Sequence, residues 1–323
     1  MRHRKHILIL LLIAVLFPFS SCEDDITFEF SNYEKKIVVE GVINQGEVPN
    51  LFLTWSSGYF DTLNINITRV YQLIEEGNFS ELEKIFGSYV VSDAFVTVSN
   101  GILTDTLTLN LTPLTFPFIN YIGSGKIIGE PGYSYTLDIV YHDSINDLNY
   151  ELFANTSIPE PVPIDSLWFE FRNPDEDSLG YIHGIFDDPQ ELGNYYRIFS
   201  RTEERDIDYV HPWNSVWNDR NINGEENINF QIYHGANTSD DPEDVNRWYF
   251  RLDEVVHVRL CAIDYEHFQF WYTYQQNAGG GGNPFASPSQ IATNISGGLG
   301  IWGGYGIYDT LYIVEHFVHP EIE

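Results

Sequence analysis

The chain has 323 residues, of which 47 are acidic and 16 are Lys or Arg, giving a formal charge of −31 at pH 7. Such a surface repels polyanions, so nucleic acid and anionic lipid headgroups are excluded as partners. Hydrophobic residues make up 43% and aromatic residues 15% of the chain. This is enough apolar surface for packed cores, so the acidity is not that of a disordered chain, and the length favours two domains.

The first 21 residues have the parts of a lipoprotein signal peptide. A basic start is followed by an uninterrupted apolar run over residues 7–17, and small residues precede Cys22. A bilayer crossing needs about 20 apolar residues, so this run is typical of a cleaved signal and not of a span. We expect residues 1–21 to be removed and Cys22 to be acylated, which would hold the protein to a membrane through lipid alone. An ordinary secretory signal with an incidental cysteine is the alternative.

Residues 22–32 form an acidic tether, and β-type sequence begins after it. Through residues 33–158, turn signals separate short runs in which apolar and polar residues alternate. Asn100-Gly101, between two such runs, predicts a hairpin. Several short strands at this spacing predict an antiparallel β-sandwich of the Ig or transthyretin type.

A proline-rich hinge divides the predicted strands into two domains. Residues 159–163, Pro-Glu-Pro-Val-Pro, favour an extended and semi-rigid backbone. Residues 164–323 are again β-rich and predict an antiparallel β domain with one aromatic-rich helix. We therefore predict a mostly β protein whose two domains are residues 33–158 and 164–323.

Acidic residues cluster in the second half at Asp187-Asp188, at Asp206 and Asp208, and around Asp240-Asp241. These patches lie in turn-like contexts, so solvated loops are the simplest interpretation. Paired carboxylates serve glycoside hydrolysis only when they face each other across a cleft. The chain has no nucleophile elbow, no H-E-x-x-H and no phosphate-binding glycine loop. We therefore predict no catalytic residues and a protein that is not an enzyme.

Two tryptophans and a histidine stand close together in the polar, proline-interrupted stretch 209–217, namely His211, Trp213 and Trp217. Exposed tryptophan is costly unless it contacts something, and tryptophan is favoured where partners bind. The stretch therefore predicts contact with a peptide, a glycan or a receptor. Packing of Trp213 and Trp217 onto their own domain is the alternative.

The next segment matches the first half of a calcium-binding loop. Its possible ligands are the oxygen-bearing side chains of Asp219, Asn221, Asn223 and Glu225. Oxygen side chains at alternate positions, with Gly224 at the bend, suit calcium. Phe230 stands where such a loop carries a bidentate Glu, so a plain type I′ hairpin turn at Asn223-Gly224 is the alternative. No other cofactor is expected.

A β-rich run over residues 255–261 comes just before the predicted helix. Cys261 has no cysteine partner once Cys22 is acylated, so we predict a small buried apolar residue and no intrachain disulfide. Residues 264–277 contain no Gly or Pro and carry six aromatic residues. They predict a helix with Asp264 as N-cap, buried against a sheet.

Four segments resemble a family of Bacteroidetes lipoproteins. Cys22 with Glu23, Asp24 and Asp25 resembles the surface-export signal of these proteins. The other three are residues 91–98, residues 186–189 with 193–197, and residues 283–288 leading into 294–302. Together they resemble the family named domain of unknown function 4249 over nearly the whole mature chain, and the last segment is the most distinctive.

The resemblance implies a location and a partner. Members of that family are commonly encoded beside TonB-dependent outer-membrane receptors. The chain is therefore expected to be an outer-membrane lipoprotein that faces the cell exterior and acts as an accessory or substrate-capturing partner of such a receptor. The family brings no catalytic residues to transfer. A free-standing glycan- or matrix-binding adhesion lipoprotein is the alternative, and a surface hydrolase is the third hypothesis.

Overall fold

The computed structural model describes residues 34–57, 69, 72–73, 76, 81, 85, 89–111, 119–173, 178–235, 244–279 and 290–315. The predicted signal peptide, Cys22, Glu23, Asp24, Asp25 and the tether lie outside these residues, as do Asp240-Asp241 and residues 283–288. Within the described ranges, no helix has the length and apolar character that a bilayer crossing requires.

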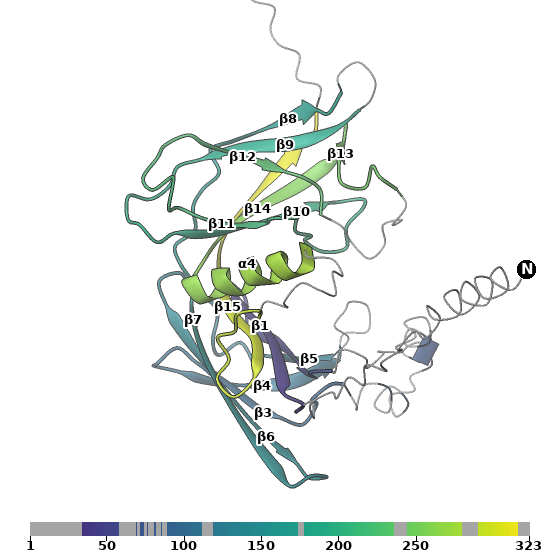
Figure 1. The fold of residues 1–323 in the computed structure, drawn as a ribbon, viewed down its shortest axis with the longest axis vertical. Coiled ribbons are helices and arrows are strands. Elements are labelled where there is room, and N and C mark those ends of the chain that lie inside the picture. The colour runs from purple at the N-terminus through teal and green to yellow at the C-terminus, as the bar shows by residue number, and fades with distance from the viewer. Residues whose placement is uncertain are drawn as a thin grey trace, which may run out of the picture. The chain divides into compact units, whose positions relative to one another are not determined.

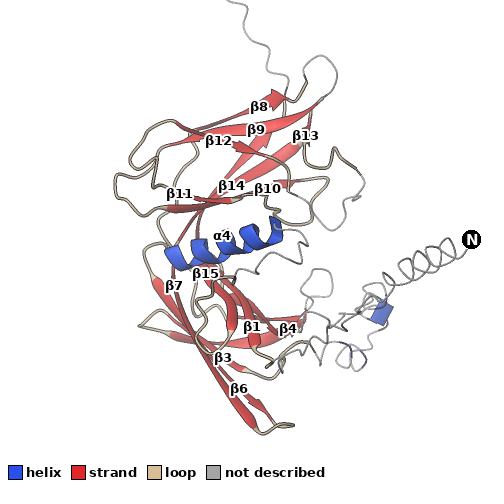
Figure 2. Ribbon diagram, viewed as in Figure 1, coloured by secondary structure: helices blue, strands red, loops and turns tan. Residues whose placement is uncertain are grey.

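The protein is mostly β, as predicted (Figure 2). The first strands are β1 (Ile37–Asn44), β2 (Asn50–Trp55), β3 (Phe95–Ser99), β4 (Thr104–Leu111), β5 (Ile119–Ile122), β6 (Ser134–Asp143) and β7 (Leu148–Ser157). The later elements are β8 (Ser166–Phe171), β9 (Leu179–Phe186), β10 (Tyr195–Thr202), β11 (Val216–Asn218), β12 (Ile228–Ile232), β13 (Phe250–Arg251), β14 (Val255–Ile263), α4 (Tyr265–Gly279) and β15 (Leu299–Ile313).

The strands form two sheets (Figure 1). The large sheet has 11 strands in the order β11-β10-β14-β15-β1-β2-β5-β4-β3-β6-β7, and in the small sheet β9 pairs with β8, β12 and β13. Among the named strands, pairing is antiparallel except between β1 and β15, where Val38 lies opposite Leu299 in a parallel pair. The large sheet is therefore mixed, which departs from the predicted purely antiparallel pairing.

The first hydrophobic core lies among the strands of the N-terminal half. Alternate side chains of β1, β2, β6 and β7 point into it, and Val39, Leu53 and Ile139 are each at most 1% exposed. Trp302 of β15 is fully buried in the same core. Accordingly β7 contacts β15, although the two are far apart in strand order.

The second core lies between the small sheet and one face of β10 and β14. Phe169 and Ile182 of the small sheet pack there with Ile198 and Val258 of the large sheet. The opposite face of β10 and β15 is covered by α4, whose Phe268 packs on Cys261. Cys261 is 1% exposed, which confirms the predicted buried cysteine.

The predicted hinge runs from β7 to β8 without regular structure, and Val162 within it is buried. The large sheet contains strands from both sides of residues 159–163. Each side also has its own core, so the division into domains 33–158 and 164–323 stays a prediction.

Two local predictions are confirmed. Asn100-Gly101 lies in the hairpin between β3 and β4. The predicted helix is α4, and Asp264 caps it by accepting a hydrogen bond from the His267 amide at 2.9 Å. The type I′ hairpin turn at Asn223-Gly224, which was the alternative to a calcium loop, is wrong, because the chain there leaves β11 in the large sheet and enters β12 in the small one. Of Asn223 and Gly224 only Gly224 has positive φ, whereas a type I′ turn needs positive φ at both residues.

Candidate functional site

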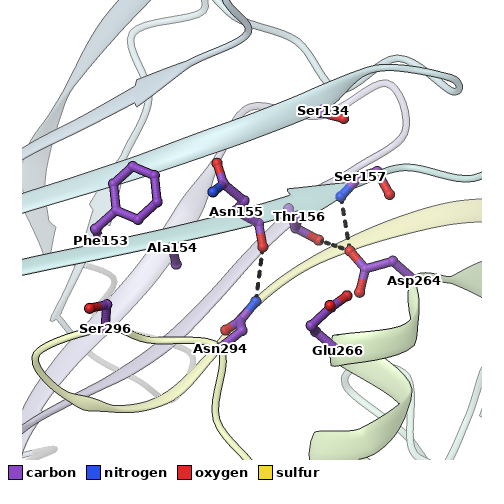
Figure 3. Close-up of a pocket in the computed structure, with 10 residues that line it drawn as sticks. All are labelled: Ser134, Phe153, Ala154, Asn155, Thr156, Ser157, Asp264, Glu266, Asn294 and Ser296. Atoms are coloured by element: carbon purple, nitrogen blue, oxygen red, sulfur yellow. Dashed lines mark hydrogen bonds between the residues drawn. The ribbon is translucent and has the colours of Figure 1, made fainter.

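An open pocket of about 540 Å³ lies where the end of β7, the start of α4 and residues 294–296 meet (Figure 3). It is lined by Ser134, Phe153, Ala154, Asn155, Thr156, Ser157, Asp264, Glu266, Asn294 and Ser296. Apart from Phe153 and Ala154 these side chains are polar, and two are acidic. None of the ten is basic, so the pocket favours hydroxyl-rich or amine-bearing ligands over anions.

Asp264 holds two sides of the pocket together. While its Oδ1 caps α4, its Oδ2 accepts hydrogen bonds from Thr156 Oγ1 at 2.6 Å and from the Ser157 amide at 2.9 Å. Glu266 lies in the first turn of α4 and is exposed. A carboxylate in this turn is stabilised by the helix dipole and remains available to a ligand.

The other side of the pocket is the segment around Asn294, which covers the edge of β7. Asn294 Nδ2 donates to the carbonyls of Asn155 at 3.1 Å and of Trp302 at 2.7 Å, and its Oδ1 accepts from the Trp302 amide at 3.0 Å. Phe153 and Ser296 exchange backbone hydrogen bonds of 3.1 and 2.8 Å. These bonds satisfy backbone groups that an edge strand would otherwise leave open.

The same segment lies beside β1 at very short range, because Val39 faces Gly300 in the parallel pair of β1 and β15. Gly300 has φ +100°, and a Cβ at this position would lie 1.9 Å from the Val39 carbonyl oxygen. Trp302 is buried, and its Nε1 donates to the Tyr135 carbonyl at 3.1 Å. The distinctive sequence 294–302 therefore serves the fold, by joining β15 to β1, β6 and β7.

The structure separates the two tryptophans of the predicted contact segment. Trp217 is partly buried and lies 5.6 Å from Tyr196, ring centroid to ring centroid, so the packing alternative holds for this residue. Trp213 is 55% exposed at a turn in which Asn214 has φ +60°. The exposed ring agrees with a contact role, which stays a prediction.

His211 lies beside a buried cation, Arg197, for which no role was predicted. The His211 ring is 6.1 Å from the ring of Trp271 on α4. Arg197 is 3% exposed, donates to the Tyr305 hydroxyl, and has its guanidinium 3.4 Å from the Trp271 ring centroid. Burial and the Arg197 charge lower the pKa of His267 to about 3. The cation–π contact fixes α4 on the sheet.

The alternation of Arg197, Phe199 and Arg201 was the available sequence signal for this centre. Residues two apart on a strand share a face, so the three side chains had to lie together. What the strand alone could not show is that α4 covers that face.

Of the four predicted calcium ligands, Asp219 and Asn223 form hydrogen bonds with backbone groups of residues 190–194. Asp219 is 2% exposed, and its Oδ2 accepts from the amides of Gly193 at 2.6 Å and Asn194 at 2.8 Å. Asn223 Nδ2 donates to the Gln190 carbonyl at 3.3 Å, and Asn221 and Glu225 are exposed. No group of three or more His, Cys, Asp or Glu able to hold a metal occurs in the described part of the chain. Calcium binding stays a prediction.

The interpretation of the acidic patches as solvated loops is wrong for two residues. Asp188 is 5% exposed and accepts from the Gly224 amide at 2.9 Å. Asp206 is 6% exposed and lies 2.9 Å from Nε2 of the buried His234. Both carboxylates satisfy donors inside loops, which compensates for the cost of burying charge.

The comparison with protein families decides the relationship. The model of the family described as Domain of unknown function (DUF4249) matches residues 23–310. The chain belongs to this family. The predicted resemblance is thus confirmed, and the DUF4249 match begins at the residue after Cys22. A comparison with curated proteins finds no match.

Proposed function

We propose that this DUF4249 protein is an outer-membrane lipoprotein that faces the cell exterior and captures a substrate for a TonB-dependent receptor. Three observations support the proposal: the signal-like residues 1–21 before Cys22, the acidic residues Glu23, Asp24 and Asp25, and the start of the family match at residue 23. In this proposal the acylated Cys22 anchors the protein and residues 22–32 let the folded part move near the membrane.

The observation that carries the capture role is the open pocket at the end of β7. Its donors and acceptors converge from three segments held in place by hydrogen bonds, so the site is formed before a ligand arrives. Glu266 adds a free carboxylate, and Phe153, 44% exposed, adds an aromatic face. A hydroxyl-rich or amine-bearing substrate fits this lining.

The anchor is tested first. The Cys22→Ser variant should appear in the soluble fraction and take up no labelled fatty acid, whereas the wild-type chain should be labelled and sediment with outer membranes. Equal sedimentation of the two proteins would contradict lipid anchoring through Cys22.

Partnership is tested by a tagged pull-down from outer membranes solubilised in mild detergent, followed by mass spectrometry. A TonB-dependent receptor should co-purify in stoichiometric amount. Because Trp213 is the exposed ring of the contact segment, Trp213→Ala should lower receptor recovery about tenfold, the effect of losing about 1.4 kcal/mol. Tyr133→Ala is the matched control, since Tyr133 is a 44% exposed aromatic residue elsewhere. Recovery of the chain alone would contradict the partnership.

The detailed layout of residues 33–158 and the alternative function belong to the same proposal. The Ig- or transthyretin-like layout of residues 33–158 stays a prediction, because the described strands there continue into one large sheet. The glycan- or matrix-binding lipoprotein remains the alternative function, and one surface favours it specifically. That surface lies on the small sheet.

A further inference from the structure

The outer face of the small sheet carries a cluster of aromatic side chains. Across β8, β9 and β12 the register places Trp168 opposite His183 and His183 opposite Gln231. Their neighbours Phe169 and Ile182 point the other way, into the second core. The aromatic residues therefore share the face of the small sheet that is opposite to the second core.

The rings on this face form two adjoining groups. The centroids of Trp168 and His183 are 5.3 Å apart, and their planes differ by 16°. Tyr181 lies 4.8 Å from Tyr233 and 5.4 Å from Tyr249, again centroid to centroid. Tyr233 is 42% exposed, whereas the other rings are half-buried. Tyr181 and His183 are two residues apart on β9, and alternate residues of a strand are about 7 Å apart on the same face. The two groups of rings therefore form one continuous surface.

Polar side chains surround the rings. Glu170, Asn229 and Gln231 are exposed beside Trp168 and His183. On the other side, the guanidinium of Arg172 lies 4.6 Å from the ring centroid of Tyr249. Together with the tyrosine hydroxyls, these groups place hydrogen-bond donors and acceptors next to aromatic faces.

We propose that this face binds a neutral saccharide chain. A pyranose ring has an apolar C–H face that packs on the electron-rich face of an aromatic ring, and hydroxyls at its edge that bind amides, carboxylates and phenols. The surface of β8, β9 and β12 alternates these two kinds of group.

The negative charge of the chain favours neutral saccharides over anionic ones. Glu170 and Arg172 bring one negative and one positive charge to the face, and Glu170 Oε2 lies 3.1 Å from His183 Nε2, while the whole chain carries −31. A sulfated or uronic polysaccharide would be repelled by that field. A peptide is less well matched, because extended peptides bind through a sheet edge with pockets for alternate side chains, and here the aromatic groups lie on a sheet face.

This inference does not depend on a receptor, so its test uses the purified full chain in non-ionic detergent. Affinity gel electrophoresis would measure retardation by dextran, laminarin and galactomannan, with heparin as the anionic comparison. At least one neutral polysaccharide should retard the wild-type chain, and heparin should not. Trp168→Ala and Tyr233→Ala should each raise the apparent Kd about tenfold. Tyr133→Ala, which removes a 44% exposed aromatic ring elsewhere, should bind as wild type.

Several results would overturn the inference. They are no retardation by any neutral polysaccharide, equal retardation by heparin, or an effect of Tyr133→Ala equal to that of Trp168→Ala. Far-UV circular dichroism checks folding, and Tyr233→Ala decides the matter if Trp168→Ala unfolds, because Tyr233 is the most exposed ring of the cluster. The two proposals can fail separately. Saccharide binding by the purified chain does not depend on whether a receptor co-purifies, and co-purification of a receptor does not depend on saccharide binding.

Discussion

Replacing Asp264 tests how α4 is fixed to β7. One carboxylate oxygen caps the helix through the His267 amide, and the other accepts from Thr156 and Ser157. Loss of an N-cap costs about 1 kcal/mol. Each hydrogen bond to a charged group contributes about 1.5 kcal/mol at the low end of its range, which applies here because the pocket is open to water. Asp264→Ala should therefore lower the free energy of unfolding by about 4 kcal/mol.

Asp264→Ser separates the two roles, because a serine hydroxyl can cap the helix but cannot reach Thr156 and Ser157 as the carboxylate does. Its loss should be about 3 kcal/mol, so the two variants should differ by about 1 kcal/mol. Urea unfolding followed by tryptophan fluorescence and far-UV circular dichroism measures both. Equal stability of the two variants would refute the cap, and a loss below about 0.5 kcal/mol for Asp264→Ala would refute the whole assignment.

Three further predictions concern the fold. Gly300→Ala should lower the free energy of unfolding by about 3 kcal/mol or more, because it adds a Cβ 1.9 Å from the Val39 oxygen at φ +100°. Gly101→Ala is the control, because Gly101 has φ +83° but nothing within 4 Å, and it should lower the free energy of unfolding by only about 1 kcal/mol. Equal melting temperatures of the two variants would contradict this. The pKa of His267, about 3 in the folded chain, lies below its unfolded value of about 6.5, so the unfolded chain binds one more proton between these pH values. Because of this group, the free energy of unfolding should fall by about 1.4 kcal/mol per pH unit as the pH drops from about 6.5. His267→Gln should remove that part of the pH dependence when urea unfolding is measured at several pH values. An unchanged pH dependence would contradict the burial of a neutral imidazole. Burial raises the pKa of the Cys261 thiol to about 12, so the Cys22→Ser chain should react with a thiol reagent at pH 8 only in denaturant, and rapid native labelling would count against a buried Cys261.

Patterns along one segment predicted local structure well. Alternating apolar residues identified most strands, and Asp264 followed by 13 residues without Gly or Pro identified α4. The parallel pairing of β1 with β15 joins residues about 260 apart in sequence and leaves no local pattern. The failure at Asn223-Gly224 has the same origin, since a turn motif does not show which sheet the next strand joins.

The candidate binding surfaces escaped prediction for a related reason. Trp168, Tyr181 and His183 all lay in a stretch predicted to be β-rich, but only the register across β8 and β9 brings them together. The pocket likewise needs β7, α4 and residue 294 at one place. Trp213, by contrast, was found from sequence because proline and polar neighbours already indicated a surface turn.

Residues 294–302 show that membership of the DUF4249 family explains the fold of this protein but not its ligand. Gly300 permits the close parallel pairing of β15 with β1, Trp302 fills the first core, and Asn294 closes the edge of β7. A match to this segment therefore identifies the fold and does not identify a ligand. Ligand chemistry has to be sought in side chains that the fold does not need, such as Glu266 in the pocket and Tyr233 on the small sheet. Substituting these two residues should change binding while leaving the unfolding free energy nearly unchanged, whereas substitutions in 294–302 should do the opposite.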